Sequence, residues 1–382
     1  MEAGKRPGRR RTLLLKVVIV LISYFVLEAG CWLMIATGLI DAKYPTFHFV
    51  FSNPEYPAPV ADINPVWGVW HYPEHYETQN GCVLLNYDIN SYGARDRERA
   101  RRSADTGRVV VLGDSFLEGF GVSVQDRVSD LLEKRTGHEF LNFCCADFGT
   151  TQEYLVYKNL ADSFDHATVL VGFLPFNDFE NDDLSLLRPG DYRYRPYYVR
   201  RGDRFVLEYH QDSLSKSTFN RAHYKVYSNA PAQIFTRFLR AFTCWFNIVD
   251  YIKNSREQYH RRFNGAGKVF SYYYDYTEEQ AQRLDYVLGL LRQAAGNRRI
   301  LLCSIPVITD FQRHRTEEGT PPLTSRLRQI CARWNIGFID LLDRFPSGTD
   351  NRGYFLPCDQ HWNLRGNRFV ADQLAPYFPR GG

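Results

Sequence analysis

Residues 109–119 read VVVLGDSFLEG, a run of four apolar residues followed by a glycine, an acid and a serine. Four consecutive apolar residues predict a buried strand, and Gly113 permits a sharp turn after it. A helix that begins near Ser115 would place the serine hydroxyl at a strand-to-helix corner, where free backbone N–H groups can bind a developing oxyanion. The same pattern is also typical of an ordinary strand-to-helix turn in which Asp114 or Ser115 caps the helix.

This stretch resembles block I of the SGNH (GDSL) serine hydrolases, G-D-S-x-x-x-G, which Gly113, Asp114, Ser115 and Gly119 fit. The resemblance implies that Ser115 is the nucleophile and that its backbone N–H is one of three donors to the oxyanion. Just upstream, residues 90–96 read NSYGARD. Membrane-anchored SGNH proteins often carry a similar N-S-x-G-x-R-D stretch, although by itself it predicts only a tight turn.

A second stretch, residues 141–150 (LNFCCADFGT), follows a predicted strand and is similar to block II. The family has a glycine about five residues after the asparagine, with its N–H in the oxyanion hole, whereas this chain has Asp147 there. Every residue except proline carries a backbone N–H. The resemblance therefore implies Asp147 as the second donor, provided that its carboxylate points away. Gly149 is the alternative if the register differs.

Two more stretches follow in the family's order. Residues 174–178 (LPFND) are similar to block III, G-x-N-D, with Pro175 replacing the glycine, which implies that the Asn177 side-chain amide is the third oxyanion donor. Residues 358–367 (CDQHWNLRGN) resemble block V, D-x-H-x-N-x-x-G. This block implies that His361 is the general base and that Asp359 fixes its tautomer. Taken singly, these patterns are also typical of a turn and of a surface loop.

Alternating predicted strands and helices favour a parallel sheet. We predict strands at 109–112, 140–142, 168–173, 300–304 and 336–339, and helices at about 128–135, 153–160, 277–291 and 323–334. Thr277 and Gln280 have the spacing of a capping box, and Gly296 suits the end of that helix. The resemblance implies a flavodoxin-like, three-layer α/β/α fold with strand order 2-1-3-4-5. The active site would lie at the carboxyl ends of the strands.

The first 40 of the 382 residues differ from the rest in charge and hydropathy. Residues 1–16 hold six basic residues against one acid, while the whole chain has a formal net charge of +4. The body is therefore nearly neutral and lacks the basic footprint of a nucleic-acid-binding protein. We expect a cytoplasmic tail at 1–12 and a transmembrane anchor at 13–40, because about 20 apolar residues span a bilayer. The positive-inside rule places the remainder in the periplasm or another extracytoplasmic space.

Two alternatives for this segment stay open. A cleaved signal peptide would have a shorter apolar region and a small-residue cleavage site. A lipoprotein signal at Cys31 is disfavoured, because Glu28 stands where an apolar residue is needed. An ionisable residue at membrane depth is by default a candidate functional group, although Glu28 could instead be protonated or reach the outer interface.

The predicted topology also indicates the redox environment of the eight cysteines. Seven of them follow Cys31 and would face an oxidising space, where disulfides form. Because seven is odd, at least one is free or pairs between chains. The adjacent Cys144 and Cys145 are interpreted as buried residues at a strand end. The sequence has no CxxC or His/Cys spacing typical of metal ligands, and the acyl-serine mechanism that the resemblance implies needs neither a metal nor a cofactor.

Between the anchor and the last helix we expect a stalk and small β ornament at 41–89, with short strands near 66–71 and 83–87, and an SGNH hydrolase-like domain at 90–378. An insertion at about 182–276 interrupts that domain, because it is too long for an ordinary crossover. Apolar residues within 234–252 recur at helical spacing. Tyrosines including Tyr197 and Tyr198 flank this helix. They form either a sugar-facing wall or the core of a subdomain.

Three functions remain open at this stage. The first is an extracytoplasmic esterase that removes O-acyl groups, O-acetyl above all, from a glycan through an acyl-serine. The second is a polysaccharide O-acyltransferase that uses the same triad with a membrane-bound O-acyltransferase partner, as anchored SGNH proteins commonly do. The third is an inactive glycan-binding module, for which Asp147 and Pro175 are the only support. The expected substrates are an acylated glycan or a small acyl ester.

Overall fold

The computed structural model describes most of the chain, in two compact units. One unit consists of Met1–Glu55 with Lys225–Arg262, and the other of Tyr56–Tyr224 with Phe263–Gly382. The described residues are 9–37, 39, 61–80, 82–187, 194–209, 235, 238–239, 242–249, 252, 267–346, 350–357 and 359–380. The predicted stalk up to residue 60 and parts of the predicted insertion lie outside them.

The larger unit is built on a five-stranded sheet in which all neighbouring strands are parallel. Its strands are β5 (Val109–Leu112), β6 (Phe140–Asn142), β7 (Thr168–Phe173), β10 (Arg299–Ser304) and β11 (Gly337–Asp340). Their spatial order is β6-β5-β7-β10-β11, which is 2-1-3-4-5 when the five are numbered along the chain. The predicted α/β class with a central parallel sheet is confirmed.

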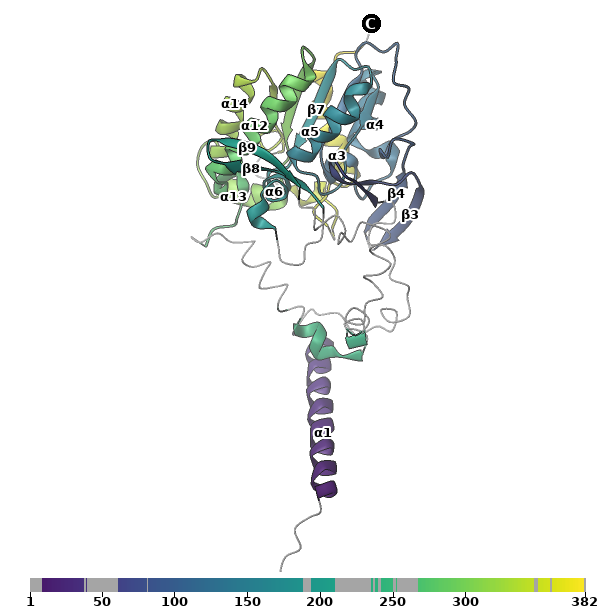
Figure 1. Ribbon diagram of the computed structural model, residues 1–382, viewed down its shortest axis with the longest axis vertical. Coiled ribbons are helices and arrows are strands. Elements are labelled where there is room, and N and C mark those ends of the chain that lie inside the picture. Colours follow the sequence, from purple (N-terminus) through teal and green to yellow (C-terminus); the bar gives the residue numbers. More distant parts are fainter. Residues whose placement is uncertain are drawn as a thin grey trace, which may run out of the picture. The chain divides into compact units, whose positions relative to one another are not determined.

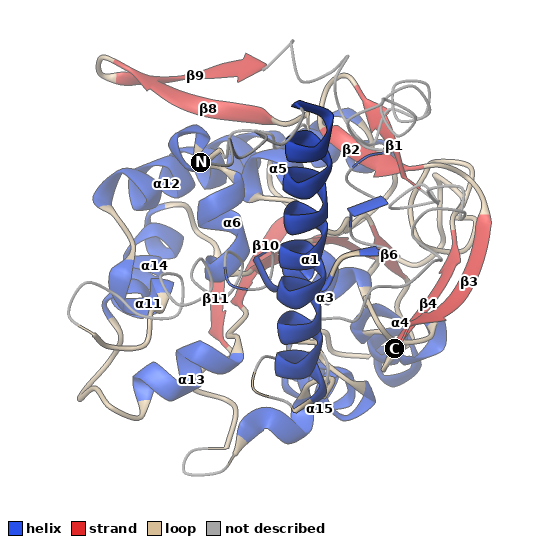
Figure 2. Ribbon diagram, turned by 90° about the horizontal axis from the view of Figure 1, so that it is seen from below, coloured by secondary structure: helices blue, strands red, loops and turns tan. Residues whose placement is uncertain are grey.

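Helices cover both faces of this sheet (Figure 2). They are α3 (Ser115–Glu118), α4 (Val128–Thr136), α5 (Thr150–Asn159), α6 (Pro175–Asn181), α11 (Tyr272–Asp275), α12 (Glu278–Ala295), α13 (Ile308–His314), α14 (Pro322–Arg333) and α15 (Leu364–Leu374). Helix α4 packs against α15, and α5 packs against α12. The predicted capping box is present at the start of α12, where Thr277 and Gln280 bond reciprocally, and Gly296 ends the helix.

The core lies between the sheet and these helices. All four residues of β5 are at most 1% exposed. Burying one such valine or leucine contributes about 1.5–3 kcal/mol to folding. This strand lies between β6 and β7, so the residue that follows it is held by packed neighbours on both sides.

Three antiparallel hairpins are added to the larger unit. They are β1 (Ala61–Asn64) with β2 (Gly68–His71), β3 (His75–Asn80) with β4 (Val83–Asp88), and β8 (Pro196–Arg201) with β9 (Arg204–Tyr209). The sequence predicted strands near β2 and β4. It did not predict β3 or the β8–β9 hairpin, which lies inside the predicted insertion.

The smaller unit contains α1 (Arg9–Ala36), the first element of the chain (Figure 1). Residues Arg11–Ala36 have a mean hydropathy of 2.2 over their most apolar window, which makes α1 long and apolar enough to cross a membrane. This capacity to span a membrane is judged from the length and composition of α1 alone. A signal sequence near the N-terminus has the same properties.

Candidate active site

The turn from β5 into α3 places Ser115 at the carboxyl edge of the sheet. Asp114 is the N-cap of α3, and its side chain accepts a hydrogen bond from the Phe116 N–H at 3.0 Å. Ser115 is the first residue of that helix. Gly119 ends it with φ +84°, and a Cβ at this position would stand 2.2 Å from Cγ of Arg127. The motif's second glycine is therefore required both by its backbone conformation and by close packing.

The C-terminal end of α3 is held by Arg95, from the NSYGARD stretch. Its fully buried guanidinium donates to the carbonyl oxygens of Glu118 at 3.0 Å and Gly119 at 2.7 Å. It also donates to Val122 at 2.9 Å. The last carbonyls of a short helix have no partner within the helix, so the guanidinium stabilises the end of α3 and the turn that follows it. The upstream stretch is thus more than a turn, because it fixes the element that carries Ser115.

Three side chains from distant parts of the sequence meet at this corner. The Ser115 hydroxyl oxygen lies 2.7 Å from Nε2 of His361. On the other side of the ring, Nδ1 of His361 is hydrogen-bonded to Asp359 Oδ1, which also accepts from the His361 backbone N–H at 2.9 Å. The hydrogen bond from His361 lowers the pKa of Asp359, so the carboxylate stays charged. This is the geometry of a catalytic triad.

Aromatic rings and local hydrogen bonds fix the position of the histidine. The centroids of the Phe116 and Phe120 rings lie 4.9 and 4.5 Å from that of His361. Asn363, the N-cap of α15, accepts from the Gly366 N–H at 3.0 Å. The block V asparagine and glycine therefore build the start of α15, directly after the loop that carries the histidine. The sequence analysis did not predict the two phenylalanine contacts.

Asn177, on α6, is brought to the same corner. Its Nδ2 donates to Asp114 Oδ2 at 3.2 Å. A side-chain amide has two N–H donors, so one remains for another acceptor. Asp114 therefore both caps α3 and orients Asn177. The sequence predicted only the capping role.

Asp147 has a left-handed backbone, with φ +64°. Glycine is the residue that adopts this conformation without cost, which explains why a glycine is expected at this position. The Asp147 carbonyl accepts from Asn181 Nδ2 at 3.0 Å. Gly149 differs, because its φ is −110° and it is the N-cap of α5. A Cβ there would lie 2.7 Å from Asp182 Oδ1. Tight packing, rather than a special backbone conformation, therefore explains this glycine.

Four buried carboxyl groups, from Asp114, Glu153, Asp178 and Asp182, lie at or behind the corner. Burial raises the pKa of Asp114 and of Asp182 to about 6. Burial, followed by repulsion from neighbouring acids, raises the pKa of Glu153 and Asp178 well above their usual values. In the described part of the chain, neither carboxyl oxygen of Glu153 has a hydrogen-bond partner. Burial and the missing hydrogen bonds therefore both favour the neutral form of Glu153.

The tyrosines proposed as a sugar-facing wall are buried. Tyr197 and Tyr198, on β8, are 2% and 7% exposed. The Tyr198 ring packs edge-on against Tyr286 of α12, with centroids 5.2 Å apart. A buried ring has no free face for a sugar. The substrate-binding role assigned to these two residues is therefore wrong. They belong to a packed core instead, which was the alternative prediction.

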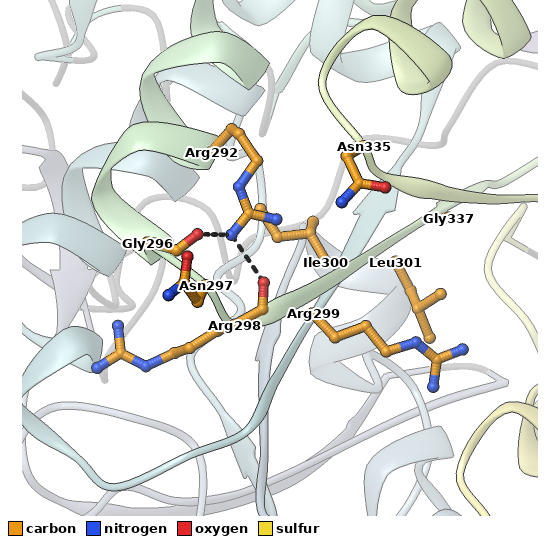
Figure 3. Close-up of a pocket in the computed structure, with 9 residues that line it drawn as sticks. All are labelled: Arg292, Gly296, Asn297, Arg298, Arg299, Ile300, Leu301, Asn335 and Gly337. Carbon is orange, nitrogen blue, oxygen red and sulfur yellow. Dashed lines mark hydrogen bonds between the residues drawn. The ribbon is translucent and has the colours of Figure 1, made fainter.

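A hollow of about 440 Å³ lies elsewhere on the same unit (Figure 3). Its lining residues are Arg292, Gly296, Asn297, Arg298, Arg299, Ile300, Leu301, Asn335 and Gly337. Several of these begin β10 and β11, so the hollow is at the amino edge of the sheet, opposite Ser115. Arg292 donates to the carbonyl of Arg298 at 2.7 Å, and Arg298 bonds Asp162 at 2.7 Å. Arg299 donates to the carbonyl of Tyr377 at 2.6 Å.

Among the described residues, no group of three or more His, Cys, Asp or Glu side chains is arranged to hold a metal ion. Cys144 and Cys145, which follow β6, are both buried, as predicted. Cys82 is disulfide-bonded.

No protein-family model matches the sequence, and no curated protein matches it. Among solved structures, the chain is similar to a lipase/acylhydrolase from Enterococcus faecalis, with 10% identity and a TM-score of 0.37 over 72% of this chain and 99% of that one. A lipolytic protein of the G-D-S-L family from Veillonella parvula has 11% identity and a TM-score of 0.35, covering 72% and 98% of the two chains.

A third similar structure is a carbohydrate esterase family 2 enzyme with a carbohydrate-binding domain, from Corynascus thermopiles (Myceliophthora fergusii). It has 10% identity and a TM-score of 0.36, covering 72% of this chain and 67% of that one. These neighbours include members of the GDSL group, whose motifs the sequence resembles.

Proposed function

We propose that this protein is a membrane-anchored serine esterase of the SGNH type that removes O-acyl groups, acetyl above all, from a glycan outside the cytoplasm. The observation that carries the proposal is the 2.7 Å contact between Ser115 Oγ and His361 Nε2, with Asp359 bonded to the opposite ring nitrogen. A serine next to a histidine that is oriented by a carboxylate is the arrangement that activates a hydroxyl for acyl transfer. A module that only binds glycans has no need of this contact.

The reaction proceeds in two steps. Ser115 Oγ attacks the acyl carbonyl carbon while His361 Nε2 takes its proton. The bond to the sugar oxygen then breaks, the proton passes from His361 to that oxygen, and the acyl group remains on Ser115 as an ester. Water repeats the attack, giving its proton to His361. Ser115 takes that proton back as the carboxylic acid leaves.

Three donors are proposed for the oxyanion that forms in each step. They are the backbone N–H groups of Ser115 and Asp147 and the second N–H of the Asn177 amide. The left-handed backbone of Asp147 and the bond between Asn177 and Asp114 support these assignments. Preorganised donors of this kind stabilise the transition state because they need no reorientation as charge develops.

Full-length protein purified in detergent tests the proposal through hydrolysis of an aryl acetate. Ser115→Ala should lower kcat by about 10⁶, whereas Ser185→Ala, at an exposed serine, should leave it unchanged. A fluorophosphonate should label the wild-type protein at Ser115 and leave the Ser115→Ala variant unlabelled. Undiminished activity of Ser115→Ala would rule out the mechanism.

The acceptor of the acyl group decides between esterase and transferase. With a labelled acetyl donor and oligosaccharide acceptors, the esterase should release free acetate. Label on the sugar would instead identify an O-acyltransferase, and a requirement for membranes would indicate a membrane-bound partner that supplies the acyl group.

The proposed topology has residues 1–12 in the cytoplasm and the larger unit outside. The disulfide at Cys82 supports it, because disulfides persist in oxidising compartments. A reporter fused after Gly382 should be active only outside the cytoplasm, and the protein should stay in carbonate-washed membranes. A shortened, soluble product would show that the apolar segment is a cleaved signal.

A further inference from the structure

The smaller unit contains an apolar surface on residues 235–252, described in part. Every described residue in this range is helical except Thr243. Its exposed apolar side chains recur at helical spacings of three, four and seven. They are Phe235, Phe238, Phe242, Val249 and Ile252, between 41% and 61% exposed. We call this set the apolar stripe. Contiguous exposed apolar residues of this kind mark an interaction surface.

Other residues of the same segment pack on α1. Cys244 and Ile248 are buried in one cluster with Cys31 and Ile35. The spacing of four in each pair is that of neighbours on one helix face. Two helices therefore lie together here, with the side chains of the apolar stripe left outside their contact.

A charged residue of α1 completes this contact. Glu28 Oε2 accepts a hydrogen bond from the backbone N–H of Cys244 at 2.6 Å. Cys244 begins the helical stretch that follows Thr243, so its N–H lacks a partner within the helix. An acidic side chain is also favoured at a helix N-terminus. The single acid of the apolar span thus has a structural role, since it binds the second helix.

The length of α1 fixes the depth of this contact. With a rise of 1.5 Å per residue, Cys31 and Ile35 lie about 27 and 33 Å along the helix from Leu13, the first apolar residue after the basic head. The hydrocarbon core of a bilayer is about 30 Å thick. The second helix therefore docks at the level where hydrocarbon meets headgroups on the far side. Trp32, at the same level, is exposed, and tryptophan is enriched at such interfaces.

From these observations we propose that the helical residues described between 235 and 252 lie at the membrane interface, docked on α1 through Glu28, with the apolar stripe among the acyl chains of the outer leaflet. The inference rests on the proposed membrane anchoring of α1. The occupant is lipid because the segment that carries the stripe packs on α1, and only 11% of the most apolar window of α1 is buried. Helices with one apolar face rich in phenylalanine bind in this way.

Photochemical labelling tests this inference on the full chain in liposomes that contain a lipid with radiolabelled acyl chains. A photoreactive phenylalanine analogue is placed at Phe238, at Val20 in the middle of α1, or at Tyr72, an exposed residue of the larger unit. We expect Phe238 and Val20 to label lipid at least tenfold more than Tyr72. Labelling at Val20 without labelling at Phe238 would overturn the interfacial helix and leave the anchor intact. Absence of labelling at both would overturn the anchor as well.

The same experiment separates other occupants of the stripe. A cross-linked dimer from Phe238, in place of lipid adducts, would show that a second copy covers the stripe. Esterase activity is measured in parallel on the same samples, so that a failure of the catalytic proposal can be distinguished from a failure of the lipid-contact proposal.

Two variants test the docking bond. Glu28→Gln keeps an acceptor for the Cys244 N–H, whereas Glu28→Ala removes it. A short thiol-to-thiol cross-linker should join Cys31 to Cys244 in wild type and in Glu28→Gln. In Glu28→Ala the yield should fall at least fivefold, and Cys31→Ser should abolish it. Equal yields in Glu28→Ala and wild type would overturn the role of Glu28.

Discussion

The two edges of the central sheet differ in what their polar side chains do. At the carboxyl edge, a short contact joins Ser115 to His361, one N–H of Asn177 remains free for an acceptor, and four carboxyl groups are buried. At the amino edge there is a hollow of about 440 Å³, but its arginines are bonded to nearby carbonyls and to Asp162. The size of a hollow therefore does not indicate where the chemistry takes place. Polar groups that still have a hydrogen-bond donor available are the better indicator.

The two edges also differ in how their residues affect the stability of the folded protein. Buried acids and a left-handed aspartate are unfavourable features that persist where function requires a fixed geometry. The arginines of the amino edge bond to backbone carbonyls and to Asp162, and we expect these contacts to affect stability rather than catalysis. Substitutions at the two edges should accordingly affect different measurements.

Among the substitutions that compare the two edges, Asp359→Asn should have the largest effect. Asparagine keeps the size of the side chain but favours the wrong histidine tautomer, so kcat should fall by about 10⁴. Aryl acetate hydrolysis measures it, with Asp343→Asn as a control at an exposed aspartate. A loss below tenfold would mean that Asp359 is not the partner that orients His361.

Asn177→Ala should have the next largest effect. Removal of one oxyanion donor costs about 10²–10³ in kcat, and KM should change little because the donor acts mainly in the transition state. Asn159→Ala, near the end of α5, is the control. A change confined to KM would assign Asn177 to ground-state binding instead.

Asp182→Asn should change stability rather than chemistry. Because burial raises the pKa of Asp182 from 3.8 to about 6, the folded protein keeps a proton that the unfolded chain releases. The free energy of unfolding therefore falls as the pH rises from about 4 to 6 and changes little above that. Asparagine can still accept from the Thr151 N–H, bonded at 3.1 Å.

Urea unfolding of the variant and of wild type measures this difference. The two should be similarly stable at pH 4, and the variant should be more stable by about 2–3 kcal/mol at pH 7, at 1.4 kcal/mol per pH unit. A constant difference across this range would show that Asp182 has the same proton affinity in both states.

Arg298→Ala, at the amino edge, should have the smallest effect. The Arg298–Asp162 pair is one-third to two-fifths exposed, and pairs of this kind contribute about 1 kcal/mol or less. Hydrolysis should be unchanged. A hundredfold loss of kcat/KM would mean that the amino edge takes part in the reaction, which would remove the contrast between the two edges.

Local sequence patterns predicted the sheet, whereas the resemblance to the SGNH blocks predicted that Ser115, Asp359 and His361 lie together. The four consecutive apolar residues 109–112 predicted the bounds of β5. The capping-box spacing of Thr277 and Gln280 predicted the start of α12. The β8–β9 hairpin was missed because closely spaced tyrosines such as Tyr197 and Tyr198 are equally typical of ligand walls and of cores. Nor could the sequence reveal the bond from Asn177 to Asp114 or the burial of Glu153, because both depend on packing between distant segments.

The order of the two units along the chain has a consequence for release of the protein from cells. The chain leaves the anchor, forms part of the larger unit, returns to the smaller unit at Lys225–Arg262 and then completes the sheet. If α1 anchors the protein as proposed, a protease that cuts only between α1 and β1 would not release the larger unit from the membrane, because the segment docked on α1 still holds it. Shedding would require further cuts on both sides of that segment, or detachment of its helix from Glu28.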